Sequence, residues 1–299
     1  MRPQAAALKA LLEGSEMYLM PGVGDGMGAR LVAEAGFKVG FASGSSISAM
    51  KLGMPDMDLL SFPEMRDAVA NVVTAAPSVL WLGDGDTGYG NEFAVQRTVR
   101  EYARLGCAAV LIEDKQWPRP LAKDGAKLTI ERDAATLRLT AAIHAAKEEG
   151  VLLLARTDSR PSRGFEEALE RIKIFTALGA DILFLDSPAS GEEQRAAVAA
   201  SGGKPHISVT SPSGKPYTAI NADLAANGIK IAIYPQEVLS ATVKAVRATL
   251  AGLHAGGEPI GLETPANLAV AVRRAEYLAA DLRLAGMTEH HVGKIIKLP

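Results

Sequence analysis

The chain has 299 residues, 48% of them hydrophobic, and a formal net charge of −2, which suits one large α/β barrel or two ordinary domains and excludes the basic surface of a nucleic-acid-binding protein. Its longest apolar runs are far shorter than the roughly 20 residues that cross a bilayer, and its single cysteine excludes an internal disulfide. We therefore expect a cytoplasmic protein whose partners are small metabolites, with no nucleic acid and no membrane.

The first 20 residues contain Glu13 and Glu16, which predicts a leading amphipathic helix and not a secretion signal. After them, short apolar runs alternate with turns and helical patterns, as in repeated βα units. The runs that predict strands are 18–23, 38–42, 78–83, 108–113, 151–156, 181–186, 206–209 and 229–234. Eight parallel strands close a barrel, so we predict one (β/α)8 TIM barrel domain over residues 1–299.

Helical patterns occupy the spaces between these strands. Residues 91–106 place Phe93, Val95 and Val99 at helical spacing and end on Gly106, a residue typical of helix C-termini. The stretch 165–179 ends on a glycine in the same way. Residues 255–299 predict a C-terminal helical extension of the barrel, which could pack on a neighbouring subunit.

Polar groups stand at the ends of nearly all the predicted strands. In a (β/α)8 barrel these C-terminal ends meet on one rim, where the active site is assembled. In chain order the groups are Asp25, Ser43 to Ser46, Asp84 and Asp86, Glu113 and Asp114, Arg156 and Asp158, Asp186, Ser208 and Thr210, and Tyr234. Their convergence predicts an enzyme.

The acidic groups predict a metal site. Crowded carboxylates take up protons unless a cation holds them, and Mg²⁺ usually keeps waters while it contacts one or two carboxylates. We therefore expect Mg²⁺, or Mn²⁺ in its place, with Asp84 as the direct ligand and Asp56, Asp86 and Glu113 around its water shell.

The remaining rim groups predict an anionic carboxylate substrate. Arg156 offers a planar fork that binds a carboxylate through two hydrogen bonds. The backbone N–H groups of Ser43, Gly44 and Ser45 could form a second anion cradle. A short 2-oxo or 2-hydroxy acid, which chelates a metal, suits such a site, and Asp84, Ser208 and Thr210 complete the predicted substrate-binding set.

Several motifs together resemble the isocitrate lyase/phosphoenolpyruvate mutase superfamily: GDGDTGYGN (83–91), LIEDKQWP (111–118), LLARTDS (153–159), SGSS (43–46) and LGMPD (52–56). The resemblance covers roughly the first 240 residues. It implies a (β/α)8 barrel, Mg²⁺, an oligomer (a dimer or homotetramer) that exchanges its last barrel helix between subunits, and chemistry through an enolate. It also implies the metal and carboxylate-binding roles already predicted for Asp84, its acidic neighbours, Arg156 and the Ser43 to Ser45 cradle.

The sequence also departs from that family. Its isocitrate and methylisocitrate lyases carry a KRCGH loop whose cysteine is the acid, whereas this chain has RPLAKDG at 119–125, without cysteine or histidine. The mutases' Lys-Thr-Asn triplet is absent there as well, and Asp186 stands where the lyases have a glutamate. These differences favour an enolate-forming enzyme with an altered leaving group.

We predict a Mg²⁺-dependent lyase that cleaves a C–C bond of a short 2-oxo or 2-hydroxy dicarboxylate, by oxaloacetate-like decarboxylation or by methylisocitrate or alkylmalate-type cleavage. Arg156 and Glu113 are the expected catalytic groups, with Asp186 or Tyr234 as the base that a retro-aldol step needs. The alternatives are P–C bond chemistry on phosphonopyruvate, as a mutase or hydrolase, and a catalytically silent member that binds a metabolite.

Other interpretations of single residues stay open at this point. Arg156 and Asp158 could form a structural salt bridge at the rim, and Ser43 to Ser46 could be a tight turn. Lys115 and Arg119 could close over the substrate or be solvated loop charges. Cys107 precedes an apolar strand and is expected to be a buried, inert thiol.

Overall fold

The computed structural model describes residues 1–120, 127–210 and 214–284. Contacts within the chain divide it into two units, Met1–Leu239 and Ser240–Pro299. The second unit thus begins earlier than the predicted extension at residue 255. No helix in the described ranges combines the length and the apolar character that crossing a membrane requires.

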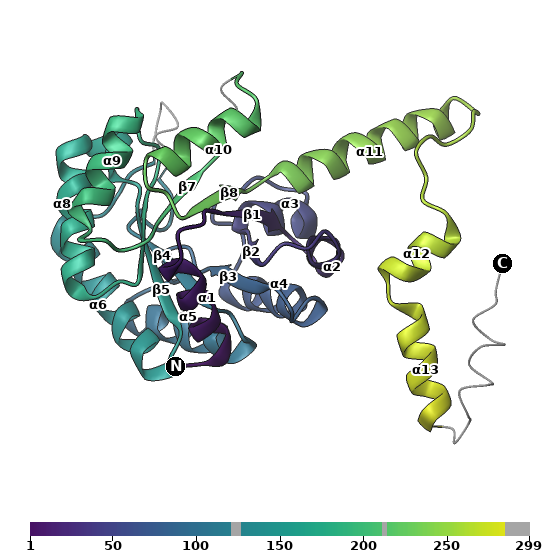
Figure 1. The fold of residues 1–299 in the computed structure, drawn as a ribbon, viewed down its shortest axis with the longest axis horizontal. Helices are drawn as coiled ribbons and strands as arrows, with labels where there is room; N and C mark the ends of the chain where they lie inside the picture. The colour runs from purple at the N-terminus through teal and green to yellow at the C-terminus, as the bar shows by residue number, and fades with distance from the viewer. Residues whose placement is uncertain (121–126, 211–213, 285–299) are drawn as a thin grey trace. The chain divides into compact units, whose positions relative to one another are not determined.

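The first unit is built on a closed barrel. Its strands are β1 (Tyr18–Val23), β2 (Val39–Ala42), β3 (Leu80–Asp84), β4 (Ala109–Glu113), β5 (Leu152–Thr157), β6 (Ile182–Leu185), β7 (His206–Val209) and β8 (Ile231–Tyr234). Each strand pairs in parallel with the next, and β8 closes the barrel on β1 (Figure 1). The predicted (β/α)8 barrel is confirmed.

Helices connect the strands and surround them (Figure 1). They are α2 (Gly26–Glu34), α3 (Gly44–Leu52), α4 (Phe62–Ala75), α5 (Glu92–Leu105), α6 (Arg132–Glu149), α7 (Ser159–Arg163), α8 (Phe165–Leu178), α9 (Gly191–Ala200) and α10 (Tyr217–Ala226). As predicted, α5 and α8 end at Gly106 and Gly179, whose φ angles of 99° and 103° lie in the left-handed region that glycine adopts without steric cost.

Apolar side chains pack in two layers, because successive residues of a strand point to opposite faces. Between strands and helices lie residues such as Trp81, Val110 and Leu153. Inside the barrel lie residues such as Leu111 and Leu154.

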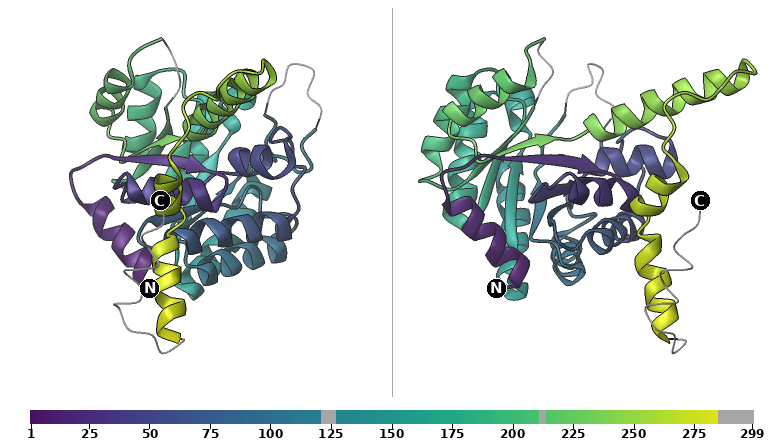
Figure 2. Two further views of the ribbon diagram at one scale, coloured as in Figure 1. Left: turned by 90° about the vertical axis from the view of Figure 1, so that its right-hand side faces the viewer. Right: turned by 45° about the vertical axis from the view of Figure 1, so that its right-hand side comes forward.

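Helix α1 (Pro3–Glu13) closes the N-terminal end of the barrel (Figure 2). Its Ala5, Leu8 and Leu12 are buried with the barrel-interior side chains. The Arg2 N–H donates to the Gly150 carbonyl, 2.8 Å away, just before β5. The opposite end, where the strands finish, is therefore the end that can hold an active site.

The second unit contains helices α12 (Pro265–Ala271) and α13 (Arg274–Leu284), and α11 (Glu237–His254) leads into it. The prediction of C-terminal helices is thus confirmed over the described residues; residues 285–299 lie outside them. Helix α11 has no buried residue and exposes the apolar side chains of Val243, Val246, Leu250 and Leu253.

Candidate active site

The alternation of side chains along the strands decides which residues reach the mouth of the barrel. In β4, for example, Leu111 lies in the interior whereas Val110 and Ile112 face the helices. The interior series of β2 to β6 continues to Ser43, Asp84, Glu113, Arg156 and Asp186. Five of the predicted site residues therefore meet at the C-terminal mouth.

The same alternation turns three predicted residues away from the mouth. The Ser208 hydroxyl accepts a hydrogen bond from Gln194 Nε2 of α9 (3.1 Å). The Tyr234 hydroxyl donates to Asn221 Oδ1 of α10 (2.7 Å), and the Thr210 hydroxyl donates to a carbonyl oxygen of β8. The structure does not bring Ser208, Thr210 or Tyr234 to the acidic cluster, because they follow the outward-facing series of β7 and β8.

Asp84 and Asp86 are held by backbone and side-chain donors. Asp84 Oδ2 accepts the N–H of Gly44 at 3.0 Å, and its Oδ1 accepts the N–H of Asp86 at 3.2 Å. The Tyr89 hydroxyl donates to Asp86 Oδ2 at 2.5 Å. Both Asp86 and Tyr89 have positive φ, 46° and 62°, a conformation that is costly for non-glycine residues and is found at functional sites. Tyr89 is a site residue that sequence reasoning missed, although the GDGDTGYGN motif contains it.

The predicted anion cradle is the N-terminus of α3, with Ser43 as its N-cap residue. The Ser43 and Ser45 Oγ atoms lie 3.1 Å apart. The Gly44 N–H already donates to Asp84, so the cradle and the acidic cluster share one donor. A substrate carboxylate bound at Ser45 would lie next to Asp84.

Basic side chains cover the other side of the cluster. Glu113 Oε1 lies 2.6 Å from Lys115 Nζ, and Glu113 Oε2 lies 3.3 Å from Arg156 Nε. Lys115 is buried, so it is part of the site and not a solvated loop charge.

Arg156 is an ion-pair centre of the mouth. Its Nε and Nη2 donate to Asp158 at 2.8 and 2.6 Å, which is the salt bridge considered from the sequence. Its Nη2 also lies 3.2 Å from Asp186 Oδ1. Lys127 Nζ lies 2.6 Å from Asp186 Oδ2 and 3.1 Å from Asp158 Oδ1. Lys127 was not predicted; it comes from the loop after β4, where no sequence pattern points to the site.

The acidic side chains are protonated more easily than usual. Burial, together with the charge of Asp56, raises the pKa of Asp84, and burial with the charges of Asp84 and Glu113 raises the pKa of Asp86 well above its usual value. Burial raises the pKa of Glu113 to about 7, although Lys115 and Arg156 act in the opposite direction. A cation among these groups would stabilise their ionised forms.

The donor set fits Mg²⁺ held by few direct ligands. Within residues 1–120, 127–210 and 214–284, no three His, Cys, Asp or Glu side chains are arranged as a metal cage. Mg²⁺ does not need one, because it usually keeps several waters and contacts one or two carboxylates. Asp84, Asp86 and Glu113 suit that arrangement. Asp56 is half-exposed, and its Oδ1 lies 3.7 Å from Arg119 Nη2, so it belongs to the rim of the cluster.

The rim beside the cluster forms a small pocket. Asp56, Asp86, Tyr89 and Trp117 line it, together with apolar side chains such as Leu59. Its position next to Asp86 makes it part of the mouth. Two larger surface hollows lie elsewhere, by α9 and α10 and by the start of α6. They contain none of the predicted site residues, so hollow size does not mark the site here.

The sequence and the fold both match known proteins. The family model for phosphoenolpyruvate phosphomutase matches residues 8–254. The 2,3-dimethylmalate lyase of Eubacterium barkeri is 34% identical over 244 residues, which cover 81% of this chain and 83% of that protein. The petal death protein of Dianthus caryophyllus is 36% identical over 193 residues, 64% of this chain and 61% of that protein.

Among solved structures, an oxaloacetate acetylhydrolase bound to the inhibitor 3,3-difluorooxalacetate superposes with a TM-score of 0.88. It is 31% identical, and the match covers 95% of this chain and 98% of that one. The predicted family is confirmed, and the chain belongs to the phosphoenolpyruvate mutase/isocitrate lyase superfamily.

Proposed function

We propose that the chain is a divalent-metal-dependent lyase that cleaves a C–C bond of a short 2-oxo or 2-hydroxy dicarboxylate through an enolate. One observation carries the proposal: the buried carboxylates of Asp84 and Glu113, whose pKa values are raised, lie at the barrel mouth with the buried ammonium of Lys115 and the partly buried guanidinium of Arg156. This arrangement suits an anionic substrate that bridges the two sides. The similarity to a dimethylmalate lyase and to an oxaloacetate acetylhydrolase favours carbon-carbon chemistry.

Asp84 would hold Mg²⁺, or Mn²⁺, with Asp86 and Glu113 accepting hydrogen bonds from its waters. When bound, the ion supplies positive charge beside the substrate oxygen on which the electrons of the broken bond collect. Tyr89 orients Asp86 by its 2.5 Å hydrogen bond. Asp84 and Glu113 are buried, so bulk solvent has little access to them, and the waters they would contact are those held by the ion.

Arg156 orients the substrate. Within the described residues, its ion pairs use Nε and Nη2, so a substrate carboxylate would approach the guanidinium from its Nη1 side. The Ser45 N–H at the start of α3 would bind a second carboxylate. Two anchors on opposite sides of the mouth select a dicarboxylate over a monocarboxylate.

The acid-base groups differ between the two cleavage types. Decarboxylation releases CO₂ and needs no side-chain acid, because water can protonate the enolate. Cleavage of a 2-hydroxy acid needs a base at the hydroxyl group. Asp186 lies in the cluster and Tyr234 does not, so we assign this role to Asp186, whose carboxylate oxygens contact Arg156 and Lys127.

The test measures consumption of each candidate substrate together with its products, which are pyruvate or another 2-oxo acid, or oxalate where oxaloacetate is hydrolysed. Oxaloacetate, alkylmalates, methylisocitrate and phosphonopyruvate are each incubated with the protein and Mg²⁺. We expect turnover of at least one C–C substrate and its loss in Asp84→Ala. If phosphonopyruvate is the one compound consumed, P–C chemistry is favoured: release of inorganic phosphate would indicate a hydrolase, and formation of phosphoenolpyruvate would indicate a mutase. The match to the phosphoenolpyruvate phosphomutase family makes this the second candidate. No turnover above the no-enzyme blank would indicate a silent, metabolite-binding member.

We also propose that the protein is a homo-oligomer, a dimer or tetramer. The exposed apolar side chains of α11 recur at helical spacing (Val243, Val246, Leu250 and Leu253), and exposed apolar stripes mark interaction surfaces. Light scattering after size exclusion should give a multiple of 31.3 kDa. Replacing Val246 and Leu250 by Glu should shift the mass toward the monomer, and a monomeric wild-type protein would refute this proposal.

A further inference from the structure

A charged network lies directly behind the barrel wall, outside the mouth. Its centre is Arg171 of α8, which is fully buried on a helix face otherwise lined by apolar side chains such as Ile172 and Phe175. A buried cation is costly unless ion pairs and hydrogen bonds satisfy it. An apolar residue at this position would avoid the cost. The presence of a buried arginine therefore suggests that its bonds have a role beyond packing.

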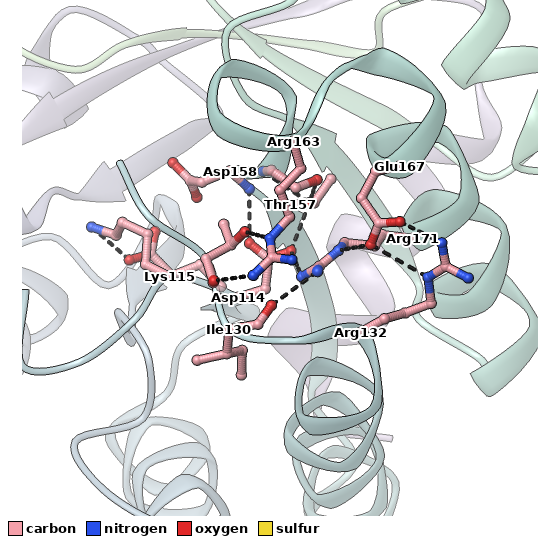
Figure 3. Close-up of polar contacts among 12 residues, drawn as sticks. Asp114, Lys115, Ile130, Arg132, Thr157, Asp158, Arg163, Glu167 and Arg171 are labelled. Carbon is pink, nitrogen blue, oxygen red and sulfur yellow. Dashed lines mark hydrogen bonds and ion pairs between the residues drawn. The ribbon is translucent and has the colours of Figure 1, made fainter. Parts of the chain in front are cut away.

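Arg171 uses all three of its nitrogens (Figure 3). Nη1 donates to Asp114 Oδ2 at 3.0 Å, and Nε donates to Glu167 Oε1 at 2.7 Å. Nη2 donates to the backbone carbonyl of Ile130 at 2.9 Å. One side chain thus joins α8 to the end of β4 and to the segment that leads into α6.

Asp114 extends this network to β5. Its Oδ1 accepts the backbone N–H of Asp158 at 2.8 Å, and its Oδ2 accepts the Thr157 hydroxyl at 2.6 Å (Figure 3). Asp114 follows Glu113 along the chain and therefore points away from the mouth. Its carboxylate ties the ends of β4 and β5 together from behind.

The residues held in this way are those that orient the mouth. Asp158, whose N–H Asp114 holds, pairs through both carboxylate oxygens with Arg156. Although burial acts to raise it, the charges of Arg156 and Lys127 keep the pKa of Asp158 below its usual value. Asp158 is thus a fixed anion, and its position sets the plane of the Arg156 guanidinium.

Residues on the outside of the barrel also hold the last part of the connection between β4 and α6. The Ile130 N–H donates to the Asp114 carbonyl at 3.0 Å. Arg163 donates to the Thr129 hydroxyl at 2.9 Å and to its carbonyl at 2.8 Å. These bonds lie two to three residues from Lys127, whose ammonium reaches the mouth.

We propose that Arg171 and Asp114 are positioning residues whose ion pair holds the ends of β4 and β5 so that the anion-binding side chains of the mouth keep their orientation. The inference rests on the proposed function only for the kinetic measurement, because the hydrogen-exchange measurement needs no substrate. Within the described residues, neither side chain pairs with Arg156 or Lys127. Asp114 therefore acts through Asp158, and Arg171 acts through Asp114.

The experiment compares Arg171→Met with a matched control, Arg132→Met. Arg132 pairs with the same Glu167 from the surface of α6, and in the described part of the chain its side chain does not hydrogen-bond Asp114 or Ile130. The two readouts are kcat and KM on the best C–C substrate, taken well below the unfolding temperature of each variant, and amide hydrogen exchange of the peptide spanning 154–160.

For Arg171→Met we expect kcat/KM to fall about 10- to 100-fold, since a displacement of about 1 Å at a reacting centre costs about 100-fold and a smaller one costs less. Loss of exchange protection at the Asp158 amide should accompany it. Arg132→Met should stay within about twofold of wild type in both readouts, because a surface ion pair contributes little. Full activity of folded Arg171→Met, or an equal loss in the control, overturns the proposal.

If Arg171→Met does not fold, Arg171→Lys decides the question. A lysine keeps the charge but cannot reach Asp114, Glu167 and Ile130 with one ammonium group. It should fold and lose part of kcat/KM, and unchanged kinetics would refute a positioning role. If the wild type turns over no substrate, the proposed function fails, and the exchange comparison between Arg171→Lys and Arg132→Met still tests the anchoring of Asp158.

Discussion

Gly44→Ala tests whether the start of α3 must touch the acidic cluster. A Cβ on Gly44 would lie 2.9 Å from Asp84 Oδ2 and 3.7 Å from Asp86 Oδ1, where ordinary contacts begin at 3.4 Å. The Asp84 carboxylate must therefore move by about 0.5 Å or lose its hydrogen bond to the Gly44 N–H. Since a 1 Å misplacement costs about 100-fold in rate, half of it should cost about tenfold in kcat/KM.

Stability should respond differently from activity. Gly44 has no left-handed φ angle, and alanine is the better helix former by at most about 1 kcal/mol. The melting temperature should therefore stay nearly unchanged. The control is Gly26→Ala, at the first position of α2, where the added Cβ would meet the Ala75 side chain at 3.3 Å and no carboxylate of the cluster.

The assay is pyruvate release over a range of Mg²⁺ concentrations. A displaced Asp84 should raise the Mg²⁺ concentration needed for half-maximal activity in Gly44→Ala but not in Gly26→Ala. Equal activity of the two variants would contradict the reasoning, because it would mean that Asp84 does not need its position against α3. A large fall in melting temperature for Gly44→Ala would also count against it.

The remaining predictions concern the metal, two tyrosines and one histidine. Removal of divalent ions with EDTA should abolish turnover, and added Mg²⁺ or Mn²⁺ should restore it; activity that persists in EDTA would exclude the metal-dependent proposal. Tyr89→Phe removes the 2.5 Å hydrogen bond to Asp86 and should lower kcat/KM about tenfold, as expected for a bond of about 1.5 kcal/mol to a charged group. Tyr234→Phe should stay within about twofold of wild type, because its hydroxyl bonds Asn221; a large loss of kcat would return Tyr234 to the mechanism. Burial lowers the pKa of His206 to about 4 from 6.5, so the unfolded chain binds more protons than the folded one between these values and stability falls as the pH drops from 6.5 to 4, by at most about 3 kcal/mol. In urea titrations at pH 7 and pH 4.5, His206→Leu should therefore lose less stability on acidification than wild type, and an equal loss would assign the acid sensitivity to other groups.

The order of elements could be predicted because each strand is an apolar run bounded by residues that stop it. The ends were less predictable, since they depend on single backbone hydrogen bonds. β3 begins at Leu80 and not at residue 78, because the Val79 N–H bonds the Ala76 carbonyl in a turn. β8 begins at Ile231 and not at residue 229, because the Ile229 N–H bonds the Leu224 carbonyl at the end of α10. Apolar character alone does not separate such residues from the strands they precede.

The acidic residues of the site could be predicted because they stand at strand ends. The prediction of substrate-binding residues needed one more criterion, the alternation of side chains between the two faces of a strand. Ile207 and Ile231 fill the barrel interior. Ser208 follows the first directly, and Tyr234 is three residues beyond the second, so both belong to the outward series. A residue reaches the mouth only if it lies near the end of a strand and also belongs to the alternating series whose side chains point into the barrel.

Lys127 shows what strand positions cannot supply. It approaches Asp186 of β6 and Asp158 after β5 from a connection that leaves β4, so its place depends on contacts between segments far apart in the chain. Those contacts are the hydrogen bonds of Thr129 and Ile130 to Arg163 and Arg171, both from helices on the outside of the barrel. A loop cation can therefore be assigned to this mouth only after the outer helices are placed. A cation in the sequence of an otherwise apolar helix face is accordingly the signal to look for. Such a buried cation needs ion-pair and hydrogen-bond partners, and here those partners lie at the strand ends and in the connection that carries Lys127.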